Sequence, residues 1–92
     1  MGRFLIEVPH PAEKKACLEA VKLLLETGSH YLTHADFGCM DGEHTAWIVA
    51  DMENKEEARS ILPPVYRADA KIVKLSKFSL AQIEELLQRH EA

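Results

Sequence analysis

The stretch LTHADFGCMDGEHTAWIVAD, residues 32–51, decides the fold because it predicts a β-hairpin. Residues 32–39 and residues 43–51 form two segments that favour strands. Asp41-Gly42 lies between them and is a strong signal for a two-residue turn. This turn predicts a register in which the opposing residues are Cys39 and His44, Phe37 and Ala46, and Ala35 and Ile48.

The register also predicts which side chains share a face, because side chains alternate along a strand. The face of the opposing pairs is mostly apolar, and we expect the helices to cover it together with Phe4, Ile6 and Val8. The opposite face is predicted to contain Leu5, Glu7, His34, Asp36, Trp47 and Val49. It mixes large apolar groups with titratable ones, so we expect a second copy of the chain to cover it.

The segments around the hairpin complete a single domain over residues 1–92. They are a strand over residues 3–8, a helix over residues 11–27 that ends at Gly28, a second helix opening at residues 54–57, a strand over residues 71–75 and a last helix capped by Ser79. The order β-α-β-β-α-β-α begins with the ferredoxin-like unit βαββαβ. It predicts an α+β fold with a four-stranded antiparallel sheet and a C-terminal helix. We expect the first and third strands to be central and parallel to each other.

Composition and charge exclude several classes of protein. The 92 residues are 47% hydrophobic and 28% charged, which is typical of a globular domain. The net charge of −4 gives the chain no electrostatic attraction to nucleic acid or to an anionic membrane. No apolar run approaches the ~20 residues of a membrane span, and residues 1–7 do not resemble a signal peptide. Cys17 and Cys39 fit no paired spacing, so we expect small, buried, reduced thiols in a cytoplasmic protein.

Five short segments between residues 33 and 77 carry a resemblance to a known superfamily. They are HADFG at 34–38, DG at 41–42, AWIVAD at 46–51, NKEEA at 54–58 and LPPVYR at 62–67. Their pattern resembles the small dimeric α/β-barrel superfamily, in particular those of its families without an assigned function. The resemblance implies a homodimer whose two sheets pack face to face. Relatives in that superfamily include muconolactone isomerases, cofactor-independent monooxygenases and haem-binding proteins. No catalytic motif of these matches the chain, and a fold alone does not choose among them.

His34, Asp36 and Glu7 are the candidate catalytic residues, because they are predicted to share one face of the sheet. Residues two apart on a strand point the same way, within roughly 7 Å. Burial beneath a second subunit would raise the pKa of the carboxylates and let the histidine transfer protons near neutral pH. The alternative is a hydrogen-bond network at the interface that fixes the geometry of the dimer.

The candidate ligand-binding residues are His10, Trp47, Tyr66 and Arg67. The expected strand directions place His10, His30, His34, Asp51, Tyr66 and Arg67 at one end of the sheet and His44 at the other. A small aromatic or carbonyl compound would stack near Trp47, and Arg67 would bind a carboxylate through two hydrogen bonds. Alternatively, Arg67 pairs with Asp69 or Asp51 on the surface.

Metal and thiol chemistry have weaker signals, and we predict neither a metal site nor a cofactor. His30 and His34, with Asp36 or His10 nearby, are suitable ligand types, but their spacing falls across a loop and a strand. Cys39 near His44 forms a thiol–imidazole pair, but a hairpin tip offers little burial for a nucleophile.

The sequence therefore favours a homodimeric protein that binds a small organic molecule, or a cofactor-independent enzyme of the dimeric α/β-barrel type. It does not decide whether the protein is an enzyme. The alternatives are a non-enzymatic structural or interaction module and a metal-binding accessory protein that uses histidine residues. A pocket of roughly 300 Å³ or more with converging polar groups would favour ligand binding over a purely structural role.

Overall fold

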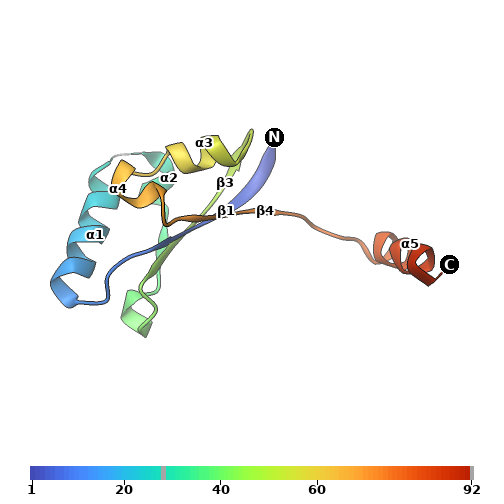
Figure 1. The fold of residues 1–92 in the computed structure, drawn as a ribbon, viewed down its shortest axis with the longest axis horizontal. Coiled ribbons are helices and arrows are strands. Elements are labelled where there is room, and N and C mark those ends of the chain that lie inside the picture. The colour runs from blue at the N-terminus through green and yellow to red at the C-terminus, as the bar shows by residue number, and fades with distance from the viewer. Residues whose placement is uncertain (28, 92) are drawn as a thin grey trace.

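The computed structural model describes residues 1–27 and 29–91, and Figure 1 shows the arrangement of its elements. These are β1 (Gly2–Pro9), α1 (Lys14–Glu26), α2 (His30–Thr33), β2 (Asp36–Phe37), the 3-10 helix η1 (Cys39–Asp41), β3 (Thr45–Met52), α3 (Lys55–Ser60), α4 (Pro64–Arg67), β4 (Lys71–Leu75) and α5 (Leu80–Glu91). The predicted end of the first helix at Gly28 lies outside the described residues.

The sheet has the strand order β2-β3-β1-β4, and every neighbouring pair is antiparallel. The prediction of an α+β chain with a four-stranded antiparallel sheet is confirmed. The first and third strands are central as expected, but they run antiparallel, with Gly2 opposite Met52 and Pro9 opposite Thr45. The expected parallel direction is therefore wrong. The more specific assignments, a ferredoxin-like fold and a dimeric barrel, stay predictions.

The hairpin keeps the predicted register over a shorter length. Phe37 opposes Ala46 as expected, and Asp36 opposes Trp47. The first strand has only two residues, because α2 replaces its predicted beginning and η1 replaces its predicted end. The connection is thus longer than a two-residue turn. Within it, η1 ends at Gly42, whose φ of 82° is a left-handed conformation that suits glycine.

Side-chain caps fix the ends of the helices. The Glu13 carboxylate accepts hydrogen bonds from the backbone N–H groups of Lys15 and Ala16 at 3.0 and 2.9 Å, so α1 begins at Lys14 and not at residue 11. The predicted cap of the last helix is confirmed: Ser79 and Gln82 exchange hydrogen bonds of 2.8 and 3.2 Å between side chain and backbone.

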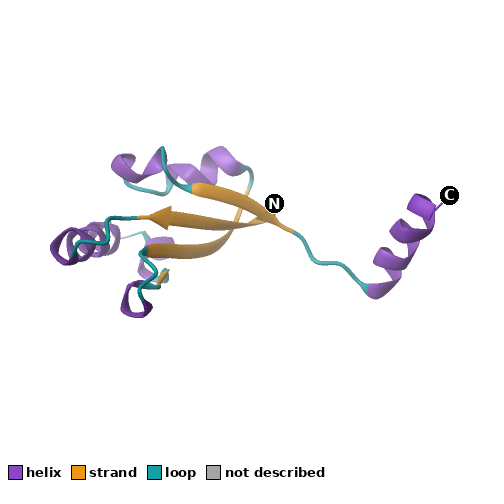
Figure 2. Ribbon diagram, turned by 60° about the horizontal axis from the view of Figure 1, so that its bottom comes forward, coloured by secondary structure: helices purple, strands orange, loops and turns teal. Residues whose placement is uncertain are grey.

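One face of the sheet holds the core, and the other is open. The buried side chains of the central strands are the even-numbered ones that the alternation predicts: Phe4, Ile6, Val8, Ala46, Ile48, Ala50 and Met52. They pack with Leu24 of α1, Leu32 of α2, Ala58 of α3 and Leu62. Figure 2 shows these helices beside the sheet and α5 standing apart from it. None of the helices in the described part of the chain is long and apolar enough to cross a membrane.

Candidate metal centre

Four potential metal ligands meet at one end of the sheet, and each comes from a different segment. His10 follows β1, Cys17 lies in the first turns of α1, Cys39 opens η1, and His44 precedes β3. Because β1 and β3 are antiparallel, the end of β1 lies beside the start of β3, and the His10 N–H donates to the His44 carbonyl at 3.1 Å. This pairing brings the two histidines together, which corrects the expectation that they lie at opposite ends.

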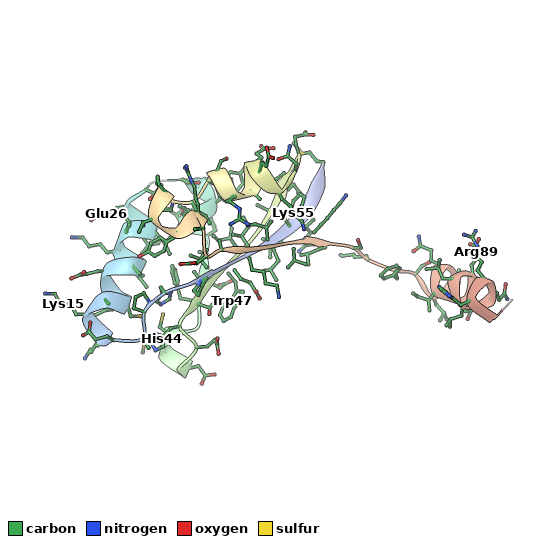
Figure 3. All side chains as sticks on the ribbon, viewed as in Figure 1. Lys15, Glu26, His44, Trp47, Lys55 and Arg89 are labelled. Carbon is green, nitrogen blue, oxygen red and sulfur yellow. The ribbon has the colours of Figure 1, made fainter. Side chains whose placement is uncertain are left out.

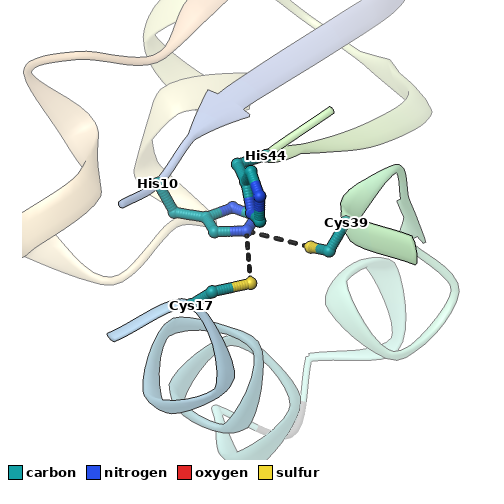
Figure 4. A group of neighbouring side chains, drawn as sticks. All are labelled: His10, Cys17, Cys39 and His44. Atoms are coloured by element: carbon teal, nitrogen blue, oxygen red, sulfur yellow. Dashed lines mark hydrogen bonds between the residues drawn. The ribbon is translucent and has the colours of Figure 1, made fainter. Parts of the chain in front are cut away.

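The donor atoms of the four side chains face one another (Figure 4). His10 Nε2 lies 3.0 Å from Cys39 Sγ and 3.3 Å from Cys17 Sγ. The His44 ring meets the His10 ring edge to face, with a centroid distance of 5.7 Å and an interplanar angle of 89°. One donor atom from each of the four residues lies within 4.8 Å of all the others. We call this group the His₂Cys₂ cluster.

The His₂Cys₂ cluster is largely shielded from solvent. Cys17 is 4% exposed and His10 is 9% exposed, while Cys39 and His44 are half-buried. The Nδ1 atoms of His10 and His44 are buried and have no hydrogen-bond partner among the described residues. His10 faces the two sulfurs with Nε2, so its Nδ1 is not one of the converging donor atoms.

Burial also sets the protonation states. Desolvation, together with the neighbouring His44, lowers the pKa of His10 below its ordinary value. Desolvation and the neighbouring Cys39 raise the pKa of Cys17. A neutral imidazole is the form that binds a metal, whereas a thiol must lose its proton first. The histidine is therefore prepared for a metal, and the cysteines would become thiolates as the metal binds.

The loop that positions Cys39 depends on close packing around Gly38. The Gly38 carbonyl oxygen accepts hydrogen bonds from the N–H groups of Asp41 and Glu43 at 3.0 and 2.9 Å. The Gly38 N–H donates to the Thr45 carbonyl oxygen at 3.1 Å. A Cβ atom at Gly38 would lie 2.7 Å from the Glu43 carbonyl oxygen and 2.8 Å from the Trp47 ring. The absence of a side chain thus lets the loop fold against Trp47 and turn Cys39 toward the histidines.

The cysteines can be reached from outside the protein. A hollow of about 200 Å³ is lined by Cys17, Leu18, Val21, Phe37, Cys39 and Met40. Its lining is apolar apart from the two thiols. A small ion or a thiol reagent could reach the cysteines through it, but a larger polar ligand would find no hydrogen-bond partners there.

The predicted catalytic residues do not assemble in this structure. His34 is exposed and follows α2, where its Nδ1 lies 2.7 Å from the His30 carbonyl oxygen, so it does not share a strand with Asp36. Glu7 lies on the open face of the sheet, between Trp47 and Lys71. Their catalytic roles stay predictions.

The predicted ligand-binding residues lie in three places. His10 and Tyr66 line an open hollow of about 420 Å³ with Pro9, Pro11, Val65 and Asp69. Burial and the nearby Glu19 raise the pKa of Tyr66. Arg67 instead donates to the Leu62 and Ser60 carbonyls at 2.8 and 3.0 Å, which ties it to the backbone. Trp47 points away from α3 on the open face (Figure 3).

The alternative metal ligands His30 and His34 lie beside each other, with ring centroids 5.7 Å apart on the short helical segment around α2. Both are exposed, and no third ligand joins them among the described residues. Of the residues predicted to be catalytic or to bind a ligand, only His10 belongs to the His₂Cys₂ cluster, and Cys39 and His44 were considered only as a thiol–imidazole pair. Cys17, Cys39 and His44 were missed as ligands.

The chain matches no protein-family model, no curated protein and no solved structure. The site is therefore interpreted from its own chemistry.

Proposed function

We propose that the protein binds a transition-metal ion, with zinc as the best-suited ion, through the His₂Cys₂ cluster. The observation that supports this most directly is the convergence of four donor atoms within 4.8 Å from four separate segments of the chain. The four side chains are buried or half-buried and their donor atoms face one another, so a single ion could contact all four at once.

The donor set favours zinc on chemical grounds. Two thiolates and two imidazoles in a tetrahedral arrangement are typical of structural zinc sites. Zn–S bonds of about 2.3 Å and Zn–N bonds of about 2.0–2.1 Å give a tetrahedron with edges of roughly 3.3–3.8 Å. The two His10–sulfur distances of 3.0 and 3.3 Å are already close to such edges. The longest separation of 4.8 Å would close by about 1 Å, which a side-chain rotation supplies.

Four protein ligands fill the coordination shell of zinc, so the proposed role is structural or regulatory and not catalytic. The ion would join the end of β1, the start of α1, the η1 loop and the start of β3. This proposal extends the alternative of a metal-binding accessory protein, but with cysteine as well as histidine ligands.

Elemental analysis and cobalt spectroscopy of protein purified without a histidine tag would test the proposal. We expect about one zinc per chain, and we expect cobalt to give the visible bands of a tetrahedral site together with thiolate charge transfer. Cys17→Ser and His44→Gln should each weaken binding by at least 100-fold, because each removes one ligand of the shell. His34→Gln is the matched control, since it removes an exposed histidine outside the cluster. Octahedral cobalt spectra, or equal loss in the control, would contradict the proposal.

A second candidate function, binding of a small organic ligand, is favoured by the hollow that His10 and Tyr66 line. Its volume exceeds the roughly 300 Å³ that a ligand site needs. Asp69, the Tyr66 hydroxyl and the rigid Pro9 and Pro11 would orient the ligand. Fragment screening by NMR should then shift resonances of Tyr66 and Asp69 together, and shifts confined to other residues would exclude this site. A cofactor-independent reaction in the same hollow stays a prediction.

A further inference from the structure

The helix α5 carries an apolar face that nothing in the described part of the chain covers. At 100° per residue, four large apolar side chains fall on one side of the helix, and the ion pair between Glu85 and Arg89 falls on the other. The apolar side chains are Leu80, Ile83, Leu86 and Leu87, and Leu80 is 75% exposed. Such an amphipathic pattern is typical of a helix that packs against another surface. The apolar side of α5 therefore lacks a partner among the described residues.

The open face of the sheet is the second uncovered surface. Its centre is a row across three strands, in which Leu5 lies between Val49 and Val73. Val49 is 49% exposed, and Trp47 and Leu75 extend the apolar area on the same face. All the helices that pack on the core lie on the opposite face. Charged groups flank the apolar row: Lys71 lies next to Glu7, and Arg3 lies next to Asp51.

The shape of the chain shows that these two surfaces are held apart. The radius of gyration is 16.6 Å, whereas a compact chain of this length has about 12 Å. β4 continues into an extended connector that carries α5 beyond the end of the sheet (Figures 1 and 2). The connector, Ser76-Lys77-Phe78-Ser79, contains no glycine, proline, asparagine or aspartate. It is extended in the structure and so directs α5 away from its own sheet.

We infer that two copies of the chain exchange their α5 helices, so that the α5 helix of each copy packs across the open sheet face of the other. The dimensions match: a 12-residue helix is about 18 Å long, and four strands span about 14 Å. The exchange pairs two surfaces that both belong to this chain, and it produces the closed two-fold symmetry that most homodimers have.

Buried area supports a second copy as the occupant. The rim of the open face carries both signs of charge, with Arg3 beside Asp51 and Lys71 beside Glu7, so the apolar row and not charge would hold the helix. Reciprocal exchange creates two helix-on-sheet contacts and removes four surfaces from water. Two contacts bury twice the area of one, which matters because specific, stable interfaces begin at roughly 1,200 Å² of total buried area. In such a dimer helices cover the open faces, so it differs from the expected dimer in which the two sheets touch directly.

Sedimentation velocity at micromolar concentration, with Trp47 fluorescence recorded on the same samples, would test the exchange. We expect a dimer whose tryptophan emits at a short wavelength. Ile83→Glu should give a folded monomer with emission shifted to longer wavelength, and far-ultraviolet circular dichroism would confirm the fold. Ala81→Glu adds the same charge on the opposite side of α5 and should leave the dimer intact. A monomeric wild type, or an unchanged dimer in Ile83→Glu, would overturn the inference.

A crosslinking variant separates exchange from a helix that folds back on its own chain. Replacing Leu87 by the photoreactive p-benzoylphenylalanine should give a product of twice the chain mass on illumination, joined to β1 or β3 of the other copy. A product of single-chain mass with the crosslink at Val49 would show that α5 covers its own sheet, and it would overturn the proposed exchange. Neither result depends on metal binding, so this test and that of the His₂Cys₂ cluster can fail separately.

Discussion

Replacing Gly38 by alanine tests whether close packing of the hairpin loop builds the His₂Cys₂ cluster. The new methyl group would lie 2.7 Å from the Glu43 carbonyl oxygen and 2.8 and 2.9 Å from two atoms of the Trp47 ring. Overpacking of this kind costs about 1–3 kcal/mol. The reduced freedom of the unfolded chain offsets about 0.4–1 kcal/mol of it. We therefore expect the free energy of unfolding to fall by about 1–2 kcal/mol.

Urea unfolding followed by circular dichroism is the suitable assay, because Trp47 touches the new methyl group and its fluorescence would change for local reasons. For a domain of this size, the expected loss corresponds to a fall in Tm of roughly 5–15 °C. Zinc affinity should fall as well, since Cys39 directly follows the displaced residue and would move away from His10.

Gly2→Ala is the matched control for this substitution. Its new methyl group would lie 3.1 Å from Lys74 Cε, the end of a flexible side chain, and 3.2 Å from a Phe4 ring carbon, so its neighbours need to move by only a few tenths of an ångström. We expect its stability to change by less than about 0.5 kcal/mol, with unchanged zinc affinity. If Gly38→Ala behaves like Gly2→Ala in both measurements, the packing argument for the loop is refuted.

Two further predictions concern the pH dependence of stability and the N-terminal cap of α3. Burial lowers the pKa of His10 in the folded protein, so this imidazole binds a proton more readily in the unfolded chain. The free energy of unfolding should therefore be constant above about pH 7 and decline as the pH falls below about 6.5. Urea titrations at several pH values would measure this decline, which should be weaker in His10→Gln; a profile identical in both proteins would contradict it. Asn54→Ala removes the 2.8 Å hydrogen bond from the Glu57 N–H and should cost about 1 kcal/mol, whereas an unchanged urea midpoint would show that this cap contributes nothing.

Much of the sheet could be predicted from local patterns. The alternation of Phe4, Ile6 and Val8 identified the buried face of β1, and the hairpin register correctly paired Phe37 with Ala46. The segment before the hairpin was harder, because a short apolar run fits a strand or a helical turn equally well. The Ser29 hydroxyl accepts from the Tyr31 N–H and starts α2 where a strand was expected.

The candidate metal site was missed for a topological reason. His10 and His44 lie far apart in sequence, and only the direction of β3 relative to β1 brings them together. A crossover helix makes the first two strands run the same way, and the hairpin reverses the third, so the third must oppose the first. That reasoning uses sequence alone and would have found the two histidines. The predicted hairpin register already placed Cys39 opposite His44, whereas the approach of Cys17 depends on the packing of α1, which no local pattern specifies.

The backbone hydrogen bond between His10 and His44 closes a large loop of the chain that contains α1, α2 and β2. An ion held there would act as a crosslink that forms only after distant segments have met, because the unfolded chain holds no preassembled set of ligands. Its binding energy would therefore go into loop closure, and the stability of this half of the molecule would rise with the supply of free metal. The elements α3, α4 and β4 lie outside the loop and would gain stability only through the core that they share with Leu24 and Leu32.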